Sequence, residues 1–276
     1  MKIINKQLKK TASTSQPRIK MMHGLKAEPH AHVETGKPYL KETDGILALH
    51  FDTLSIQSEM SIDLPDDLVV GYTRAMMSFL LFVPAPQRIA MIGLGGGSLA
   101  KYCYRHLPQA EIVVVEINGD VIALRNEFAV PADDARFKVL LGDGAEFVAG
   151  AAVHYDALIV DGFDAGGLPA QLGSQKFYDD CFASLADSGV MVANLWGGYP
   201  HYDEYLARIG NSFSGRVAIV DADDSVNKIV LAAKNTEFPP SASTIRRQAK
   251  LLGLAHPLNF QAKSNRLIRA LPVHAV

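Results

Sequence analysis

Three glycines and one glutamate have the types and the spacing of a site for a nucleoside-bearing ligand. Gly93, Gly95 and Gly97 follow a short apolar run, and glycine lets the backbone turn sharply and approach a ligand closely. Ser98 can cap the helix that is expected to follow, whose first N–H groups are free. Glu116 stands about 20 residues further on, at the end of a second apolar run, where a carboxylate can bind both hydroxyls of a ribose. A glycine turn alone can serve packing, but this combination favours a nucleoside site.

A second carboxylate, Asp143, ends a third predicted strand and is followed by Gly144. A carboxylate oxygen there can accept a hydrogen bond from the exocyclic amine of an adenine ring, and the glycine keeps the backbone clear of the ring. Asp143 can also cap a helix at 144–149, and the two roles are compatible. We therefore expect Asp143 and Gly144 to contact the base.

Two further carboxylates, Asp161 and Asp164, lie on a glycine-rich loop at the end of another strand. Asp161 directly follows apolar strand residues, so it is expected to emerge over the ligand. Paired acids can hold a cationic amine, and one of them can accept a proton as the amine attacks carbon. Asp beside Gly is also common in turns, but the strand end favours a catalytic role. Gly166 and Gly167 suit a lid that excludes water.

These side chains need a sheet whose strands end at one edge. From residue 87 the pattern alternates between apolar runs and helical segments, which predicts right-handed crossovers and a doubly wound sheet. Ligands of such sheets bind beyond the carboxyl ends of the strands, where the glycine turn and the carboxylates fall. The predicted strands are 88–93, 111–116, 136–141, 155–160, 189–195, 215–220 and 227–233, and the predicted helices between them are 98–106, 118–128, 143–149, 174–185 and 201–213.

The last two predicted strands are joined only by residues 222–225. This link is too short for a parallel crossover, so the two strands are expected to pair antiparallel. Such a sheet differs from the NAD-binding arrangement. The expected fold class is α/β: a doubly wound, mostly parallel seven-stranded sheet of the S-adenosylmethionine-dependent methyltransferase type with an antiparallel final strand, plus a small N-terminal β-hairpin region.

Outside this sheet the patterns are weaker. Residues 1–27 carry seven Lys or Arg and no acid, which is typical of a mobile tail. Turn signals and helix-start signals predict a β-hairpin at 44–60, a helix at 66–82 and a further helix at 243–252. The chain thus divides into a basic leader (1–40), a hairpin and helix (41–86), a nucleoside-binding α/β core (87–235) and a C-terminal extension (236–276).

The composition is that of a globular protein, with 48% hydrophobic and 20% charged residues among 276. A net charge of −2 gives no overall attraction to nucleic acid or to an anionic membrane. No apolar stretch reaches the ~18 residues of a membrane span, and the N-terminus lacks the apolar region of a secretory signal. The two cysteines, Cys103 and Cys181, form neither a disulfide framework nor a zinc spacing. We expect a cytoplasmic protein that needs no metal and has no nucleic-acid or membrane partner.

From about residue 44 to residue 196 the chain resembles the spermidine synthase family, the polyamine aminopropyltransferases. The motifs that carry the resemblance are Gln57 in the hairpin, Tyr72, the glycine turn 93–98, residues 115–117, residues 142–144, Asp161 with Asp164, and Phe177 with Tyr178.

The resemblance implies a role for each matching residue. The side that binds decarboxylated S-adenosylmethionine, or the product methylthioadenosine, would consist of the glycine turn with Gln57, Glu116, Asp143 and Gly144. Asp161 would accept the proton, while Asp164 and Tyr72 would position an amine or polyamine substrate. The resemblance also implies a homodimer.

The chain departs from the family pattern at three positions. The family's glycine turn carries an Asp where this chain has Gly96. The acid of the family's Tyr-(His/Gln)-Glu motif is replaced by Arg74, and the proline after the second Asp of the loop is replaced by Ala165. Each change removes negative charge or rigidity where a diamine cation would bind. Nucleoside binding is therefore better supported than polyamine specificity.

Three other functions stay open. A methyltransferase would use the same site for S-adenosylmethionine, with Arg74 as a partner for the carboxylate of that ligand. A nucleoside-binding relative without catalysis would fit the missing acid at Gly96. An NAD-dependent dehydrogenase is disfavoured by the short link at 222–225 and by the paired acids. The leading hypothesis is a spermidine-synthase-like transferase that moves an aminopropyl group to an amine.

Overall fold

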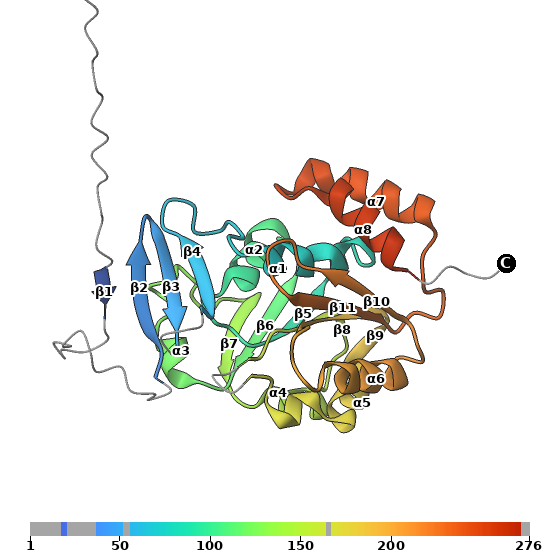
Figure 1. The fold of residues 1–276 in the computed structure, drawn as a ribbon, viewed down its shortest axis with the longest axis horizontal. Helices are drawn as coiled ribbons and strands as arrows, with labels where there is room; N and C mark the ends of the chain where they lie inside the picture. The colour runs from blue at the N-terminus through green and yellow to red at the C-terminus, as the bar shows by residue number, and fades with distance from the viewer. Residues whose placement is uncertain (1–17, 21–36, 52–55, 164–166, 272–276) are drawn as a thin grey trace, which may run out of the picture.

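The computed structural model describes residues 18–20, 37–51, 56–163 and 167–271. Its centre is a seven-stranded sheet with helices on both faces, and a smaller antiparallel sheet lies beside it (Figure 1). Within these ranges no helix has the length and apolar character needed to cross a membrane.

The central sheet has the predicted strand reversal at one end. Its strands are β5 (Arg88–Ile92), β6 (Glu111–Glu116), β7 (Phe137–Leu141), β8 (Tyr155–Val160), β9 (Leu185–Trp196), β10 (Val217–Asp221) and β11 (Asn227–Ala233). They lie in the order β10-β11-β9-β8-β5-β6-β7. The five strands from β5 to β9 run parallel, whereas β11 is antiparallel to both β9 and β10. The predicted fold class is confirmed.

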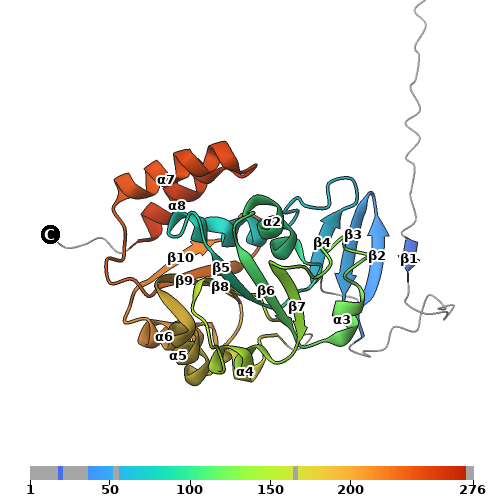
Figure 2. The same ribbon diagram turned by 180° about the vertical axis from the view of Figure 1, so that it is seen from behind.

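Helices cover the two faces of this sheet separately (Figure 2). One face carries α4 (Gly144–Ala149), α5 (Gln175–Ser184) and α6 (Tyr202–Ser212), and the other carries α1 (Gly71–Met76), the 3₁₀ helix η1 (Met77–Leu81), α2 (Ser98–His106), α7 (Ala242–Ala255) and α8 (Phe260–Ala270). Alternate residues of β5 enter different cores: Ile89 and Met91 pack on the α1 side, and Ala90 and Ile92 pack on the α5 side. Burial on both faces explains why the strand is apolar throughout.

The smaller sheet contains β1 (Arg18–Lys20), β2 (Tyr39–Thr43), β3 (Ile46–His50) and β4 (Ser58–Ser61) in that order. β3 and β4 form the hairpin predicted at 44–60, although residues 52–55 of its turn lie outside the described residues. β2 was not predicted from the sequence; it pairs with β3, and the turn between them contains Asp44 and Gly45. Both residues have positive φ, 50° and 77°, as tight hairpin turns require.

The helix predicted at 66–82 begins later than expected. α1 starts at Gly71, whose N–H donates to the Asp224 carboxylate at 3.0 Å, and it passes into η1 at Met77. Asp224 lies 153 residues further along the chain. A helix start that is fixed by so distant a partner leaves no local signal in the sequence.

Two other helices differ from the prediction. The segment expected to be helical over 118–128 is helical only in α3 (Gly119–Ala123), because the chain then continues in turns. The Phe128 carbonyl of those turns accepts a hydrogen bond from Lys101 Nζ at 2.7 Å. α8 was missed altogether. Its signals are the cap Asn259 and the buried positions 260, 264 and 267, of which Ser264 interrupts the apolar pattern.

Candidate active site

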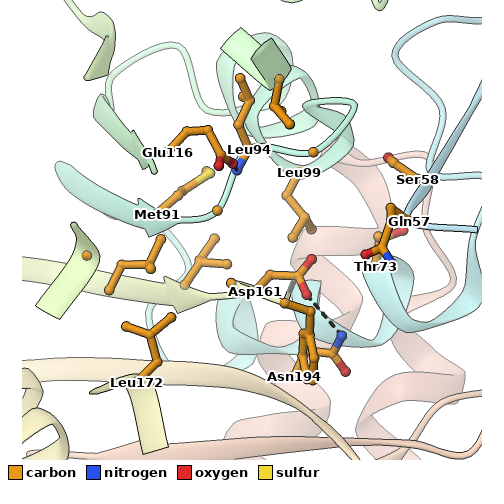
Figure 3. A pocket seen from close by; sticks show the side chains of 18 of the residues that line it. Gln57, Ser58, Thr73, Met91, Leu94, Leu99, Glu116, Asp161, Leu172 and Asn194 are labelled. Carbon is orange, nitrogen blue, oxygen red and sulfur yellow. Dashed lines mark hydrogen bonds between the residues drawn. The ribbon is translucent and has the colours of Figure 1, made fainter. Parts of the chain in front are cut away.

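A cavity of about 620 Å³ opens at the carboxyl ends of the central strands. It is lined by the loops after β5, β6, β7 and β8, by the ends of β9 and β11, and by α1 and the segment before β4. Gly93, Gly95, Glu116, Asp143 and Asp161 all line it, so residues far apart in sequence meet in one site (Figure 3).

The glycine turn has backbone conformations that favour glycine. φ is 93° at Gly93, 51° at Gly95 and 69° at Gly97. Gly97 is the N-cap of α2, and no side chain caps this helix. The expected cap at Ser98 is wrong, since Ser98 already lies within the helix and its Oγ donates to the Glu59 carbonyl at 3.3 Å.

Gly93→Ala is expected to reduce the free energy of unfolding more than Gly215→Ala does. Both positions have positive φ, a conformation that destabilises the folded state by about 1–2 kcal/mol when the residue has a Cβ. A Cβ at Gly93 would also lie 2.2 Å from the Asp161 carbonyl oxygen, whereas one at Gly215 has nothing within 4 Å. We expect the clash to add roughly 1–3 kcal/mol, measured by urea unfolding. Equal losses in the two variants would contradict this account of the turn.

Glu116 is held in a fixed orientation at the end of β6. Its side chain is buried, and Oε2 accepts a hydrogen bond from the Leu94 N–H at 2.8 Å. Oε1 accepts from the Asn118 N–H at 2.8 Å. A carboxylate has about four acceptor sites, so Glu116 keeps capacity for two hydroxyl donors in the cavity. This is the arrangement that a ribose requires.

Asp143 combines a capping role with a place in the cavity. Its Oδ1 accepts a hydrogen bond from the Ala145 N–H at 2.7 Å and caps α4. Capping was one of the two compatible roles expected from the sequence, and contact with the base was the other. Asp143 and Gly144 both line the cavity. A Cβ at Gly144 would lie 2.4 Å from Ile92 Cγ2, so the close packing of β5 alone requires glycine there.

Asp161 lies at the centre of a hydrogen-bonded group formed by three elements. Tyr72 Oη, from α1, donates to Asp161 Oδ2 at 3.1 Å. Asn194 Nδ2, from β9, donates to Asp161 Oδ1 at 2.9 Å, the contact drawn in Figure 3. The two donors hold one oxygen each and fix the plane of the carboxylate.

The surroundings of Asp161 change its acidity. Burial raises the pKa of Asp161 above its ordinary value, and the hydrogen bonds from Asn194 and Tyr72 offset part of that rise. Burial, together with the neighbouring Asp161 charge, raises the pKa of Tyr72 well above its ordinary value. Tyr72 therefore remains a protonated donor to Asp161, while Asp161 becomes a stronger base than an exposed carboxylate. A carboxylate that is both held in place and more basic suits the role of a proton acceptor.

The remaining predicted site residues are Gln57, Gly97 and Asp164. Gly97 is not among the residues that line the cavity. Gln57, from the segment before β4, lines the cavity near Thr73 of α1 (Figure 3). Asp164 lies outside the described residues, together with Gly166 of the expected lid. The role of Asp164 stays a prediction.

The charged groups that line the cavity within the described ranges are all acidic. They are Glu116, Asp143 and Asp161, with no Lys, Arg or His among them. Arg74 does not line the cavity, because its guanidinium pairs with Asp224 at 3.2 Å and donates to backbone carbonyls of 68 and 69. The suggestion that Arg74 receives a substrate carboxylate is therefore wrong. Asp224, in the link between β10 and β11, binds both Arg74 and the start of α1.

The missing acid at Gly96 leaves no void. A Cβ there would lie 2.7 Å from Ser58 Oγ and 2.8 Å from Phe128 Cδ1. Position 96 thus packs between the smaller sheet and the turn after α3, and it has no room for a carboxylate in this structure.

Two amides of the site, Asn194 and Asn227, were not predicted from the sequence to have a role. Asn194 is only 4% exposed within the otherwise apolar end of β9, and Asn227 begins β11. A polar residue in a fully buried strand is a usable signal, because such a group needs a hydrogen-bond partner. Its partners could not be predicted, since they depend on the pairing of β9 with β8 and β11.

Comparison with known proteins identifies relatives with this architecture. The model of the spermine/spermidine synthase domain matches residues 70–226. The polyamine aminopropyltransferase of Chromobacterium violaceum is 38% identical over 83% of this chain and 88% of that protein. A spermidine synthase in complex with the transition-state analogue AdoDATO has a TM-score of 0.62 at 20% identity, covering 87% of this chain and 84% of that one. Human methyltransferase-like protein 13 in complex with SAH has a TM-score of 0.61 at 23% identity, covering 67% and 91%. The chain belongs to the spermine/spermidine synthase family.

Proposed function

We propose that this protein is an aminopropyltransferase, which moves the aminopropyl group of decarboxylated S-adenosylmethionine to an amine and releases methylthioadenosine. Membership of the family supports this proposal, as does the name of the relative from Chromobacterium violaceum. The observation that carries it is Asp161, a carboxylate of raised pKa with two hydrogen-bond donors in a cavity whose described charges are all negative. Such a cavity favours a ligand that carries a sulfonium and an ammonium but no carboxylate.

The division of labour follows from the positions of the side chains. Glu116 would hold both ribose hydroxyls, and the second oxygen of Asp143 would accept from the adenine amine. The carbon beside the sulfonium is then electrophilic without help from the protein. The chain has to align the amine and to remove its proton, and the bond from carbon to nitrogen forms as the bond from carbon to sulfur breaks. Asp161 receives the proton, and Tyr72 steadies the carboxylate.

The proposal is tested by incubating the purified protein with decarboxylated S-adenosylmethionine and a panel of diamines and polyamines. We expect methylthioadenosine and an aminopropylated amine to appear in equal amounts. Calorimetry with the carboxylated and decarboxylated forms separates this function from methyl transfer. Tighter binding of the carboxylated form, with a methylated product, would contradict aminopropyl transfer. Binding of methylthioadenosine without turnover on any amine would favour a non-catalytic relative.

The pH dependence of kcat/KM should report the raised pKa of Asp161. Because only the ionised carboxylate can accept a proton, activity should fall as the pH drops through the pKa of Asp161. That pKa lies above the ordinary value of 3.8 for an aspartate, so the acid limb should also lie above it. The effect on the free energy of unfolding has the opposite direction. Because the folded state favours protonated Asp161, the ionised carboxylate destabilises the fold above the raised pKa, and this destabilisation disappears as the pH falls. An acid limb at or below 3.8 would contradict the role of Asp161 as base.

Three further expectations belong to the same proposal. Asp164 would help Tyr72 to position the amine, which the amine KM of Asp164→Asn checks. The protein would act as a homodimer, which sedimentation of the purified protein checks. It would be located in the cytoplasm, which fractionation of the cells that make it checks.

A further inference from the structure

Two asparagines connect Asp161 to the antiparallel strand β11. Asn194 Nδ2 donates to Asp161 Oδ1 at 2.9 Å, and Asn227 Nδ2 donates to Asn194 Oδ1 at 2.8 Å. In the ladder between β9 and β11, Asn194 lies opposite Ile229 and Asn227 lies opposite Trp196. The two asparagines are therefore diagonal neighbours on one face of the sheet, within reach of each other. Both line the cavity.

The charge of Asp161 sets the direction of every hydrogen bond in this chain of amides. An ionised carboxylate can only accept, so the NH₂ group of Asn194 must face it. The oxygen of Asn194 then faces Asn227, and the NH₂ group of Asn227 must face that oxygen. The side-chain oxygen of Asn227, Oδ1, is left over, and no donor within the described residues reaches it. Asn227 Oδ1 does not belong to the buried polar atoms that lack a partner, so it is accessible, and Asn227 lines the cavity.

Two aromatic residues line the same cavity as Asn227. Trp196 is opposite Asn227 in the ladder, and the ring of Tyr199 lies 6.3 Å from that of Trp196 between centroids. Both rings line the cavity. An aromatic face attracts an alkylammonium group, so this side of the cavity combines a hydrogen-bond acceptor with a surface for a cationic amine.

We propose that Asn227 is a positioning and specificity-determining residue for the acceptor amine. It keeps Asn194 turned as a donor to Asp161, and it offers its own oxygen to an N–H of the acceptor. This inference rests on the proposed function, since it assumes an amine substrate. It assigns to β11 a direct part in the site, because the antiparallel pairing brings Asn227 beside the carboxylate.

We call the hydrogen-bonded link from Asn227 through Asn194 to Asp161 the relay. The relay should change the pKa of Asp161, whereas a purely structural role of Asn227 would leave that pKa unchanged. Without Asn227, Asn194 is free to rotate and donates less well, so the pKa of Asp161 should rise further. Tyr72 on α1 is the titratable group that contacts Asp161 within the described residues, and β9 and β11 contribute the two amides. Asn227→Asp should raise this pKa more than Asn227→Ala, because a carboxylate at 227 attracts the NH₂ group of Asn194 away from Asp161.

The test compares Asn227→Ala, the isosteric Asn227→Asp and the control Asn265→Ala, an exposed asparagine of α8. We expect Asn227→Ala to raise the amine KM on the order of tenfold, with the affinity for methylthioadenosine unchanged. Carboxyl ¹³C NMR of the free protein should give a higher pKa for Asp161 in both Asn227 variants. In an Asn194→Ala background, Asn227→Ala should cause no additional rise, since the link is already broken.

Each possible result decides one part of the inference. An unchanged pKa of Asp161 in both Asn227 variants would overturn the relay. An unchanged amine KM would overturn the role of Asn227 in binding the acceptor amine. An additional rise in the Asn194→Ala background would also overturn the relay. The NMR titration needs no turnover, so a protein that transfers no aminopropyl group would disprove the proposed function while the relay is still tested.

Discussion

Asp161→Asn should lower the turnover for aminopropyl transfer by a factor on the order of 10²–10⁴, the usual contribution of a positioned base. The amide nitrogen cannot accept a proton, yet the side chain keeps its shape and volume. Affinity for methylthioadenosine should stay within about threefold of the parent value, because Glu116 and Asp143 are untouched. Single-turnover kinetics and calorimetry measure the two quantities separately.

The fold should tolerate this change. One atom of the new amide can still accept from Asn194, and the Tyr72 hydroxyl can reverse its role and accept from the other. Removing a carboxylate whose pKa is raised by burial also removes a destabilising charge at neutral pH. Asp187→Asn is the matched control, since Asp187 is exposed and its change should leave turnover unaltered. If Asp161→Asn kept full turnover on its amine, Asp161 would not be the base.

Glu116→Gln should produce the opposite pattern, a loss of binding. Both oxygens of Glu116 accept from backbone N–H groups, at Leu94 and Asn118. A glutamine presents an NH₂ group to one of them, which leaves a buried donor without an acceptor and displaces the glycine turn. Such a group destabilises by about 1–3 kcal/mol. We expect the Kd for methylthioadenosine to rise roughly ten- to hundredfold, with a loss of stability of similar size.

The control for this prediction is on the same strand. Glu111→Gln makes the same chemical change at the exposed start of β6, where the side chain only approaches Arg88 at 3.7 Å. It should leave both the Kd and the free energy of unfolding nearly unchanged. Loss of binding in both variants would indicate a general effect of charge instead of a ribose contact. Unchanged binding in Glu116→Gln would remove Glu116 from the nucleoside site.

The parts of the site that could be predicted are those that depend on local pattern. Glu116 ends β6, while Asp143 and Asp161 follow β7 and β8, and parallel strands place their carboxyl ends at one edge. The glycine turn was recognisable because Gly93, Gly95 and Gly97 occupy conformations that other residues rarely adopt. The short link at 222–225 was sufficient to predict the strand reversal.

The parts that escaped prediction depend on contacts between distant segments. The Asp224 carboxylate accepts hydrogen bonds from Gly71 and Arg74, which lie about half a chain length away in sequence. Neither the start of α1 nor the orientation of Arg74 could therefore be predicted from local sequence. Asn194 and Asn227 meet only through the register of β9 and β11. The sequence reveals an asparagine in a buried strand, but the alignment of the two strands decides which side chain it meets.

In the proposed mechanism Asp161 deprotonates the amine while Glu116 holds the nucleoside. A crystal structure of the protein with methylthioadenosine and a polyamine bound is the sharpest test of this mechanism. We expect both ribose hydroxyls on the Glu116 carboxylate, the sulfur facing the Asp161 side of the cavity, and an amine nitrogen within hydrogen-bond distance of Asp161. A nucleoside bound away from Glu116, or an Asp161 side chain that points away from the amine, would contradict it.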